Sequence, residues 1–137
     1  REPLESSGVR LLLNEQWRHD GVTWVGIDSA AGGRAQIELA FAQTPEPPAI
    51  VLWHEPDLVE MVPPGCVLQI SGHSHGGQFR FPGGYTPVYS DLGRRYPRGS
   101  YPDTPTPLYV SRGVGTTLLP TRFLCPPEVS LLILEPG

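Results

Sequence analysis

The stretch CVLQISGHSHGGQ, residues 66–78, decides the fold because it joins an apolar run to two histidines framed by glycines. Residues 66–70 are typical of a short buried strand, so His73 and His75 fall where this strand opens into a loop. A glycine-rich turn can direct both imidazoles toward one cavity, and imidazole is a common ligand of divalent transition metals. The same pattern is also compatible with polar loop histidines that have no ligand role.

A second apolar run ends in the same way. Residues 49–57 read AIVLWHEPD, so a predicted strand over residues 49–53 is followed directly by His54. Ligands of open α/β sheets gather beyond the carboxyl ends of the strands, which gives His54, His73 and His75 a reason to converge. The remaining histidine, His19, lies beside a predicted hairpin turn, and we expect it to be structural.

The other periodic segments predict an α/β (α+β) fold, a mixed β-sheet with helices on one face. Strands are expected over residues 9–15 and 22–28, joined by the strong hairpin dipeptide Asp20-Gly21, and later over 108–111 and 129–134. Spacing of apolar residues predicts a helix over 34–43. Pro56 begins a short helical turn, in which we expect Leu58, Met61 and Val62 to point inward.

Residues 79–107 have no periodicity and are rich in proline, glycine, tyrosine and arginine. A loop of this length within a compact domain is usually a functional lid or a disordered segment, and the aromatic residues argue against simple disorder. Its arginines suit the binding of phosphate oxygens, although a solvated basic loop explains them equally well.

Composition narrows the range of functions. The 137 residues suit one domain, the formal net charge is −4, and all ten basic residues are arginine. This balance argues against general binding to nucleic-acid backbones. Two cysteines form no disulfide framework; Cys66 is expected to be buried, whereas Cys125 could be exposed. The sequence has neither a signal peptide nor an apolar run long enough to span a membrane.

Taken in order, these motifs resemble the last two metal motifs of the calcineurin-like metallophosphoesterase superfamily. Within it, the chain is similar to a bacterial branch of membrane-associated phosphohydrolases. The resemblance is carried by LWHEPD at 52–57 and SGHSHGGQ at 71–78, with support from GRRY at 93–96, LYVSRGVG at 108–115, PTRF at 120–123 and PEV at 127–129.

The resemblance implies a metal-dependent hydrolase that cleaves phosphate mono- or diesters or pyrophosphate bonds. His54 and His73 would bind one divalent metal and His75 another, the metals being manganese, zinc or iron. The substrate would be a phosphate ester, for example a lipid or a nucleotide-linked compound. Because arginine and tyrosine cluster directly after His75, we also expect the loop 79–107 to overhang the metal site and Arg94 or Arg95 to face the substrate phosphate. The family resemblance is compatible with a location in the bacterial cytoplasm or at the membrane periphery.

The family's first three motifs, D-x-H, G-D-x-x-D and G-N-H-D/E, do not occur here. They supply bridging carboxylates, an asparagine ligand and the proton-donating histidine. We therefore expect residues 1–137 to be the carboxyl-terminal part of one metallophosphoesterase domain, half of a four-layer α/β/β/α sandwich. Its partner would be the amino-terminal half of the same enzyme, and alone it would be nearly inactive, without a catalytic residue of its own.

Two other classes of function stay open. One is a non-catalytic metal-binding module that retains His54, His73 and His75. The other is an interaction domain in which these histidines are ordinary loop residues without a metal. Metal content separates the second class from the first.

Overall fold

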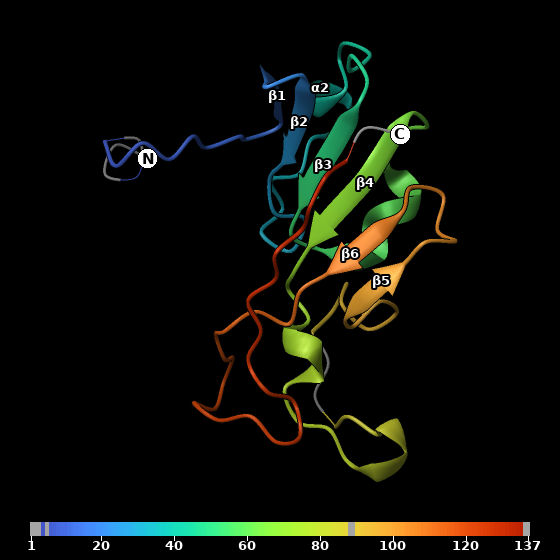
Figure 1. Cartoon of the computed structure of the whole chain (residues 1–137). Helices are drawn as coiled ribbons and strands as arrows, with labels where there is room; N and C mark the ends of the chain where they lie inside the picture. Colours follow the sequence, from blue (N-terminus) through green and yellow to red (C-terminus); the bar gives the residue numbers. More distant parts are fainter. Residues whose placement is uncertain (1–3, 5, 88–89, 136–137) are drawn as a thin grey trace.

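A six-stranded sheet organises the chain in the computed structural model, which describes residues 4, 6–87 and 90–135 (Figure 1). The strands lie in the order β1-β2-β3-β4-β6-β5. They are β1 (Glu15–His19), β2 (Val22–Ile27), β3 (Ala49–Trp53), β4 (Cys66–Ser71), β5 (Gly99–Tyr101) and β6 (Leu108–Val110). The helical elements are short: α2 (Ile37–Ala40) and the 3-10 turns η1 (Pro56–Met61), η2 (His75–Gly77) and η3 (Pro82–Gly84).

The sheet is mixed. Strands β2, β3, β4 and β6 run parallel, whereas β1 pairs antiparallel with β2, and β5 antiparallel with β6. Parallel neighbours require crossover connections, which here pass through α2 between β2 and β3 and through η1 between β3 and β4. The predicted α/β class is confirmed, and the architecture is consistent with one half of a metallophosphoesterase sandwich.

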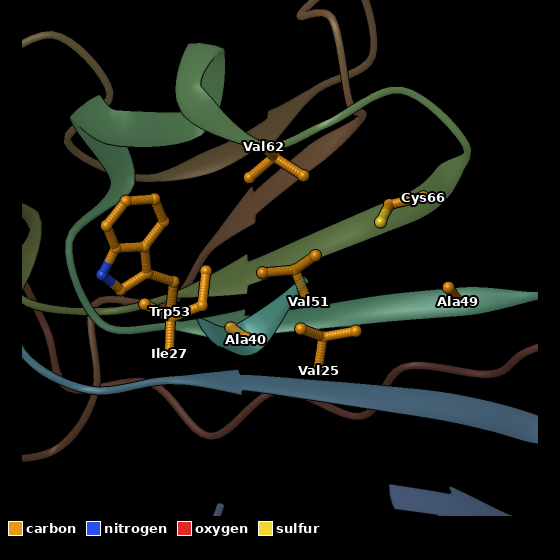
Figure 2. Close-up of a cluster of buried hydrophobic side chains, with 8 residues drawn as sticks. All are labelled: Val25, Ile27, Ala40, Ala49, Val51, Trp53, Val62 and Cys66. Atoms are coloured by element: carbon orange, nitrogen blue, oxygen red, sulfur yellow. The ribbon is translucent and has the colours of Figure 1, made fainter. Parts of the chain in front are cut away.

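One face of the sheet carries the core. Val51 lies opposite Val25 on one side and Gln69 on the other, so alternate residues of neighbouring strands share this face. Ala40 of α2 packs here, as does Val62, which directly follows η1. Figure 2 shows this cluster, whose buried members are Val25, Ile27, Ala40, Ala49, Val51, Trp53, Val62 and Cys66. A second cluster joins Val59 of η1 to Leu108 and Val110 of β6, so α2 and η1 lie on the same face of the sheet.

The strand predicted over residues 9–15 is wrong in its position. The Asp20-Gly21 turn occurs as predicted, with φ of 48° and 77°, and it pairs His19 directly with Val22. A two-residue turn fixes the register of a hairpin, so the first strand must run through His19 rather than end at residue 15. His19 therefore belongs to β1, where its ring stacks on Trp17 at a centroid distance of 4.4 Å.

The helix predicted over residues 34–43 contracts to the single turn α2. No side chain caps its N-terminus at Gln36, and Gln16 donates hydrogen bonds to the carbonyls of Ala40 and Gln43, both at 2.8 Å. Because those carbonyls bond to a side chain of β1, the chain turns away instead of continuing the helix. Among the described residues, no helix is long and apolar enough to cross a membrane.

The apolar segment 129–134 does not form the predicted strand, and Val129, Leu131 and Ile133 are 88%, 86% and 75% exposed. Both sides of β4 are already paired, with β3 and β6. The segment crosses the sheet instead, attached to β6 where the Tyr109 hydroxyl lies 2.7 Å from Ser130 Oγ. Alternation of apolar residues alone does not provide an open sheet edge to pair with.

Three smaller expectations also change. The aperiodic segment 79–107 contains η3 and the edge strand β5, which pairs with β6 through only three residues on each side. Met61 is 55% exposed rather than packed inward, unlike Val62 at 5%. Cys125 is buried together with Cys66, and both thiols are free.

We expect Val51→Ala to lower the free energy of unfolding by about 1.5–3 kcal/mol, because it removes two buried methyl groups and leaves a cavity. Val51 is fully buried, whereas Val129 is 88% exposed, so Val129→Ala is the matched control and should change stability little. Denaturant titration of both variants measures the difference. Equal effects of the two substitutions would contradict the assignment of Val51 to the core.

Acidification should weaken the attachment of the carboxyl-terminal segment. Hydrogen bonds from Arg112, aided by Tyr109 and Ser130, outweigh burial and hold the pKa of Glu128 below its ordinary value of 4.5. A lowered pKa in the folded state stabilises the protein above that ordinary value, and this stability is lost as the pH falls through the folded-state pKa. Glu128→Gln should therefore cost about 1–2 kcal/mol at pH 7.

The cost of Glu128→Gln should diminish as the pH falls below 4.5, and unfolding curves at several pH values measure it. Glu135→Gln, which alters an exposed carboxylate, is the control. A cost that does not depend on pH would contradict the role of the Glu128 charge.

Candidate metal centre

The parallel pairing of β3 and β4 brings two of the predicted histidines together. Leu52 lies opposite Ile70, so the two strands end at the same edge of the sheet, and the Gly72 amide continues the ladder with a 3.1 Å hydrogen bond to the His54 carbonyl. The rings of His54 and His73 meet edge to face, with centroids 5.0 Å apart. Two imidazoles from separate strands therefore share one position beyond the sheet.

The backbone after β4 turns unusually sharply. His73, His75, Gly76, Gly77 and Gln78 all have positive φ, between 50° and 82°. Residues other than glycine occupy this region at an energetic cost, and such residues cluster at functional sites. At Gly76 a side chain is excluded, because a Cβ there would lie 2.5 Å from Arg112 Cγ and 2.9 Å from Cys125 Sγ.

Main-chain carbonyls determine which nitrogen of each ring carries the proton. His73 Nε2 lies 2.6 Å from the Asp91 carbonyl, and His75 Nδ1 lies 3.3 Å from the Gly115 carbonyl. A carbonyl oxygen only accepts, so both ring nitrogens must donate, and the proton assignment follows from this geometry. The lone pair is then left on Nδ1 of His73 and on Nε2 of His75. Metal-binding histidines are commonly oriented by such hydrogen bonds.

The environment of His54 favours its neutral form. Partial burial of the ring lowers the pKa of His54 below its ordinary value of 6.5. The second cause is the positive charge that His73 carries when it is protonated. Glu55 opposes this shift, and His75 adds a smaller decrease in the pKa. Both His73 and His75 thus disfavour a positive charge on His54. A neutral imidazole is the form that binds a metal ion.

Glu55 is a structural residue of the site that the sequence did not reveal. Its side chain is fully buried, and Oε1 accepts hydrogen bonds from Ser29 Oγ at 2.7 Å and from the Ala31 amide at 3.1 Å. Burial raises the pKa of Glu55, but these hydrogen bonds outweigh it and the pKa lies below its ordinary value. Glu55 ties the turn after β2 to the end of β3, beside His54.

Part of the long loop reaches the histidines. Asp91 provides the carbonyl that faces His73, and Ser90 Oγ donates to the His73 carbonyl at 3.2 Å. Ser74 Oγ donates to the Pro97 carbonyl at 2.6 Å. The loop is therefore attached to the strand end that carries His73.

The two arginines predicted to bind substrate lie farther along this loop, next to η1. The Asp57 carboxylate accepts hydrogen bonds from the backbone amides of Arg94, Arg95 and Tyr96. The Arg95 guanidinium forms a 2.7 Å ion pair with Glu60 and lies 5.0 Å from the centre of the Tyr96 ring. In this conformation the Arg95 side chain is engaged with η1, and its role in substrate binding stays a prediction.

The donor chemistry fits a divalent metal, but the ligand set is incomplete. Within residues 4, 6–87 and 90–135, no group of three or more His, Cys, Asp or Glu side chains is arranged to hold an ion. His54 and His73 contact each other, and His75 stands close enough to influence His54. Imidazoles suit zinc, iron and related metals, and further ligands, typically carboxylates or water, are needed to complete a site.

Comparison with known proteins gives several relatives. The chain is 43% identical over 89 residues to the uncharacterized metallophosphoesterase YkuE of Bacillus subtilis, covering 64% of this chain and 31% of the relative. It is 31% identical over 142 residues to an uncharacterized metallophosphoesterase of Helicobacter pylori, covering 97% of this chain and 37% of the relative. It is 32% identical over 136 residues to the phosphodiesterase YaeI of Escherichia coli, covering 96% and 49%.

No family model matches the chain. No solved structure matches it either. The chain spans between about a third and a half of the length of the relatives named above. The chain belongs to the calcineurin-like metallophosphoesterase superfamily.

Proposed function

We propose that this chain provides His54, His73 and His75 to the dinuclear metal centre of a hydrolase that cleaves phosphate mono- or diesters or pyrophosphate bonds. The observation that carries the proposal is the meeting of His54 and His73, with ring centroids 5.0 Å apart, beyond two parallel strands. The relatives named as metallophosphoesterases or phosphodiesterase support the same class of reaction.

Each residue has a defined task in this proposal. His73 keeps its proton on Nε2 through Asp91 and presents Nδ1, while His75 keeps its proton on Nδ1 through Gly115 and presents Nε2. His54 is held neutral by its surroundings. Divalent ions such as Mn²⁺, Zn²⁺ or Fe²⁺, when bound by these rings, supply Lewis-acid stabilisation of phosphoryl charge and make water more acidic.

We further propose that the amino-terminal half of the same enzyme supplies the missing carboxylates and the proton donor. We place it on the part of the second face that the carboxyl-terminal segment leaves open, where Leu52 is 36% exposed and Ile70, opposite it, is half-buried. Tyr109, which binds Ser130 of that segment, pairs with Ile70 on the same face. Leu12 already lies on this face, because a Cβ on Gly26 would approach Leu12 Cβ to 2.2 Å. An apolar face of this kind is stabilised when a second layer covers it.

The test is hydrolysis of a simple chromogenic phosphodiester by the full-length protein with added Mn²⁺. His73→Ala should abolish turnover by removing a metal ligand, whereas His19→Ala should leave it unchanged. His19 stacks on Trp17 and pairs with Val22 at the start of β2, at the opposite end of the sheet from His54 and His73. The isolated 137-residue chain should be slower by at least roughly 10²–10⁴-fold, the usual contribution of a general acid.

Several outcomes would overturn the proposal. Comparable turnover by the isolated chain would show that it builds a complete site. Full activity of His73→Ala would remove the histidines from catalysis. Metal binding without any turnover by the full-length protein would instead indicate a non-catalytic metal-binding module.

Variants of Arg95 and Glu60 distinguish substrate binding by Arg95 from its ion pair with Glu60. If Arg95 contacts the substrate phosphate, Arg95→Ala should lower kcat/KM by a factor equivalent to about 1.5–3 kcal/mol, the value of a charged hydrogen bond. Glu60→Gln breaks the same ion pair but keeps the guanidinium, so kcat/KM should be retained or increase. Steady-state kinetics distinguish them, and an equal loss in both variants would indicate that the pair only supports the loop.

A further inference from the structure

Arg122 binds a set of main-chain carbonyls that surrounds the His75 loop. Its guanidinium donates hydrogen bonds to the carbonyls of His75 at 2.9 Å, Arg112 at 2.8 Å, Gly113 at 3.1 Å and Gly115 at 2.6 Å, with a weaker contact to Cys125 at 3.4 Å. Nε makes a further bond to the Gly115 carbonyl at 3.1 Å. This half-buried cation thus binds carbonyl dipoles of three chain segments.

The Gly115 carbonyl has a second role. It accepts from Arg122, and it also faces Nδ1 of His75 at 3.3 Å. Arg122 therefore holds His75 at two points. It binds the His75 carbonyl directly, and it binds the Gly115 carbonyl that orients the His75 ring. The direct hydrogen bond joins Arg122 to a residue 47 positions away in the sequence.

The His75 backbone needs such support. Its φ is 51°, in the left-handed region that a residue with a side chain adopts only when surrounding contacts impose it. Cys125 is buried below the turn and its thiol lies 3.4 Å from the carbonyls of both His75 and Gly76. A lysine at position 122 would keep the charge but could not span carbonyls on several sides, because only guanidinium has a planar fork of five donors.

We infer that Arg122 is a positioning residue that fixes the ring of His75 with its proton on Nδ1, so that Nε2 is the nitrogen presented to a ligand. The inference rests on the ligand role proposed above for His75. Arg122 itself touches neither substrate nor metal in this assignment, and it acts through the Gly115 carbonyl.

The first experiment measures the tautomer of His75 in the metal-free, full-length protein by long-range ¹H–¹⁵N NMR of the imidazole rings. The wild type should show His75 protonated on Nδ1. Arg122→Gln and Arg122→Lys should shift the ring toward the Nε2-protonated tautomer, because the Gly115 carbonyl is no longer held in place. Arg18→Gln is the matched control, since Arg18 pairs with Glu46 at the far end of the sheet, and it should leave the His75 signals unchanged.

The second experiment measures the affinity for Mn²⁺ alone by calorimetric titration. Loss of an outer hydrogen-bond partner typically weakens metal binding by about 10–100-fold, and we expect this loss in Arg122→Lys but not in Arg18→Gln. Circular dichroism establishes that each variant is folded. If Arg122→Gln does not fold, the role of Arg122 is still tested by the metal affinity and tautomer of Arg122→Lys and by the tautomer of His75 in the wild type.

Two results would overturn the inference: a wild-type His75 protonated on Nε2, or a folded Arg122→Lys that keeps the wild-type tautomer and metal affinity. Its failure is distinguishable from failure of the proposed function. A full-length protein without phosphoesterase activity in which the Arg122 variants still change the His75 tautomer would retain the inference and reject only the function.

Discussion

The parallel pairing of β3 with β4 is the constraint on which the site depends. Because parallel strands end at the same edge, His54 and the His73 loop leave the sheet together, and the Gly72 amide extends the ladder to the His54 carbonyl. The core is arranged to hold this pair of strands. Val51 and Trp53 of β3 are buried against the segment that follows η1 and against α2, so the strand end cannot shift without disturbing the packed face.

Beyond the strand ends, hydrogen bonds between side chains and main-chain carbonyls replace regular structure. His73, His75 and Gln78 have positive φ, and each is held by segments far away in the sequence. Gln78, which is buried, donates to the carbonyls of Thr117 and Leu119, both at 2.9 Å, and accepts from the Thr117 amide at 2.7 Å. The energetic cost of the backbone is thus offset by contacts from residues 90–91 to His73 and from residues 112–125 to His75 and Gln78.

The sequence predicted the parts of the fold that depend on local patterns. Strand β3 has the predicted bounds, because Ile50, Val51 and Trp53 favour a strand and a proline pair precedes Ala49. Segment 129–134 has an equally strong pattern but finds no open edge, and the helix over 34–43 is cut short by Gln16 from another strand. The sequence could not assign a role to Arg122, because its partners are main-chain carbonyls, which every residue has whatever its side chain.

Electrostatics bear on the metal centre that we propose for these histidines. Burial of the His54 ring and, after it, the nearby His73 lower the pKa of His54, which favours the neutral imidazole that binds metal ions. Two divalent ions held near each other, however, need negative ligands to offset their repulsion. The nearest carboxylate in sequence, Glu55, is fully buried, and its Oε1 is bound by Ser29 Oγ and the Ala31 amide in the turn after β2. The dinuclear centre that we propose would therefore take its bridging carboxylates from residues other than Glu55.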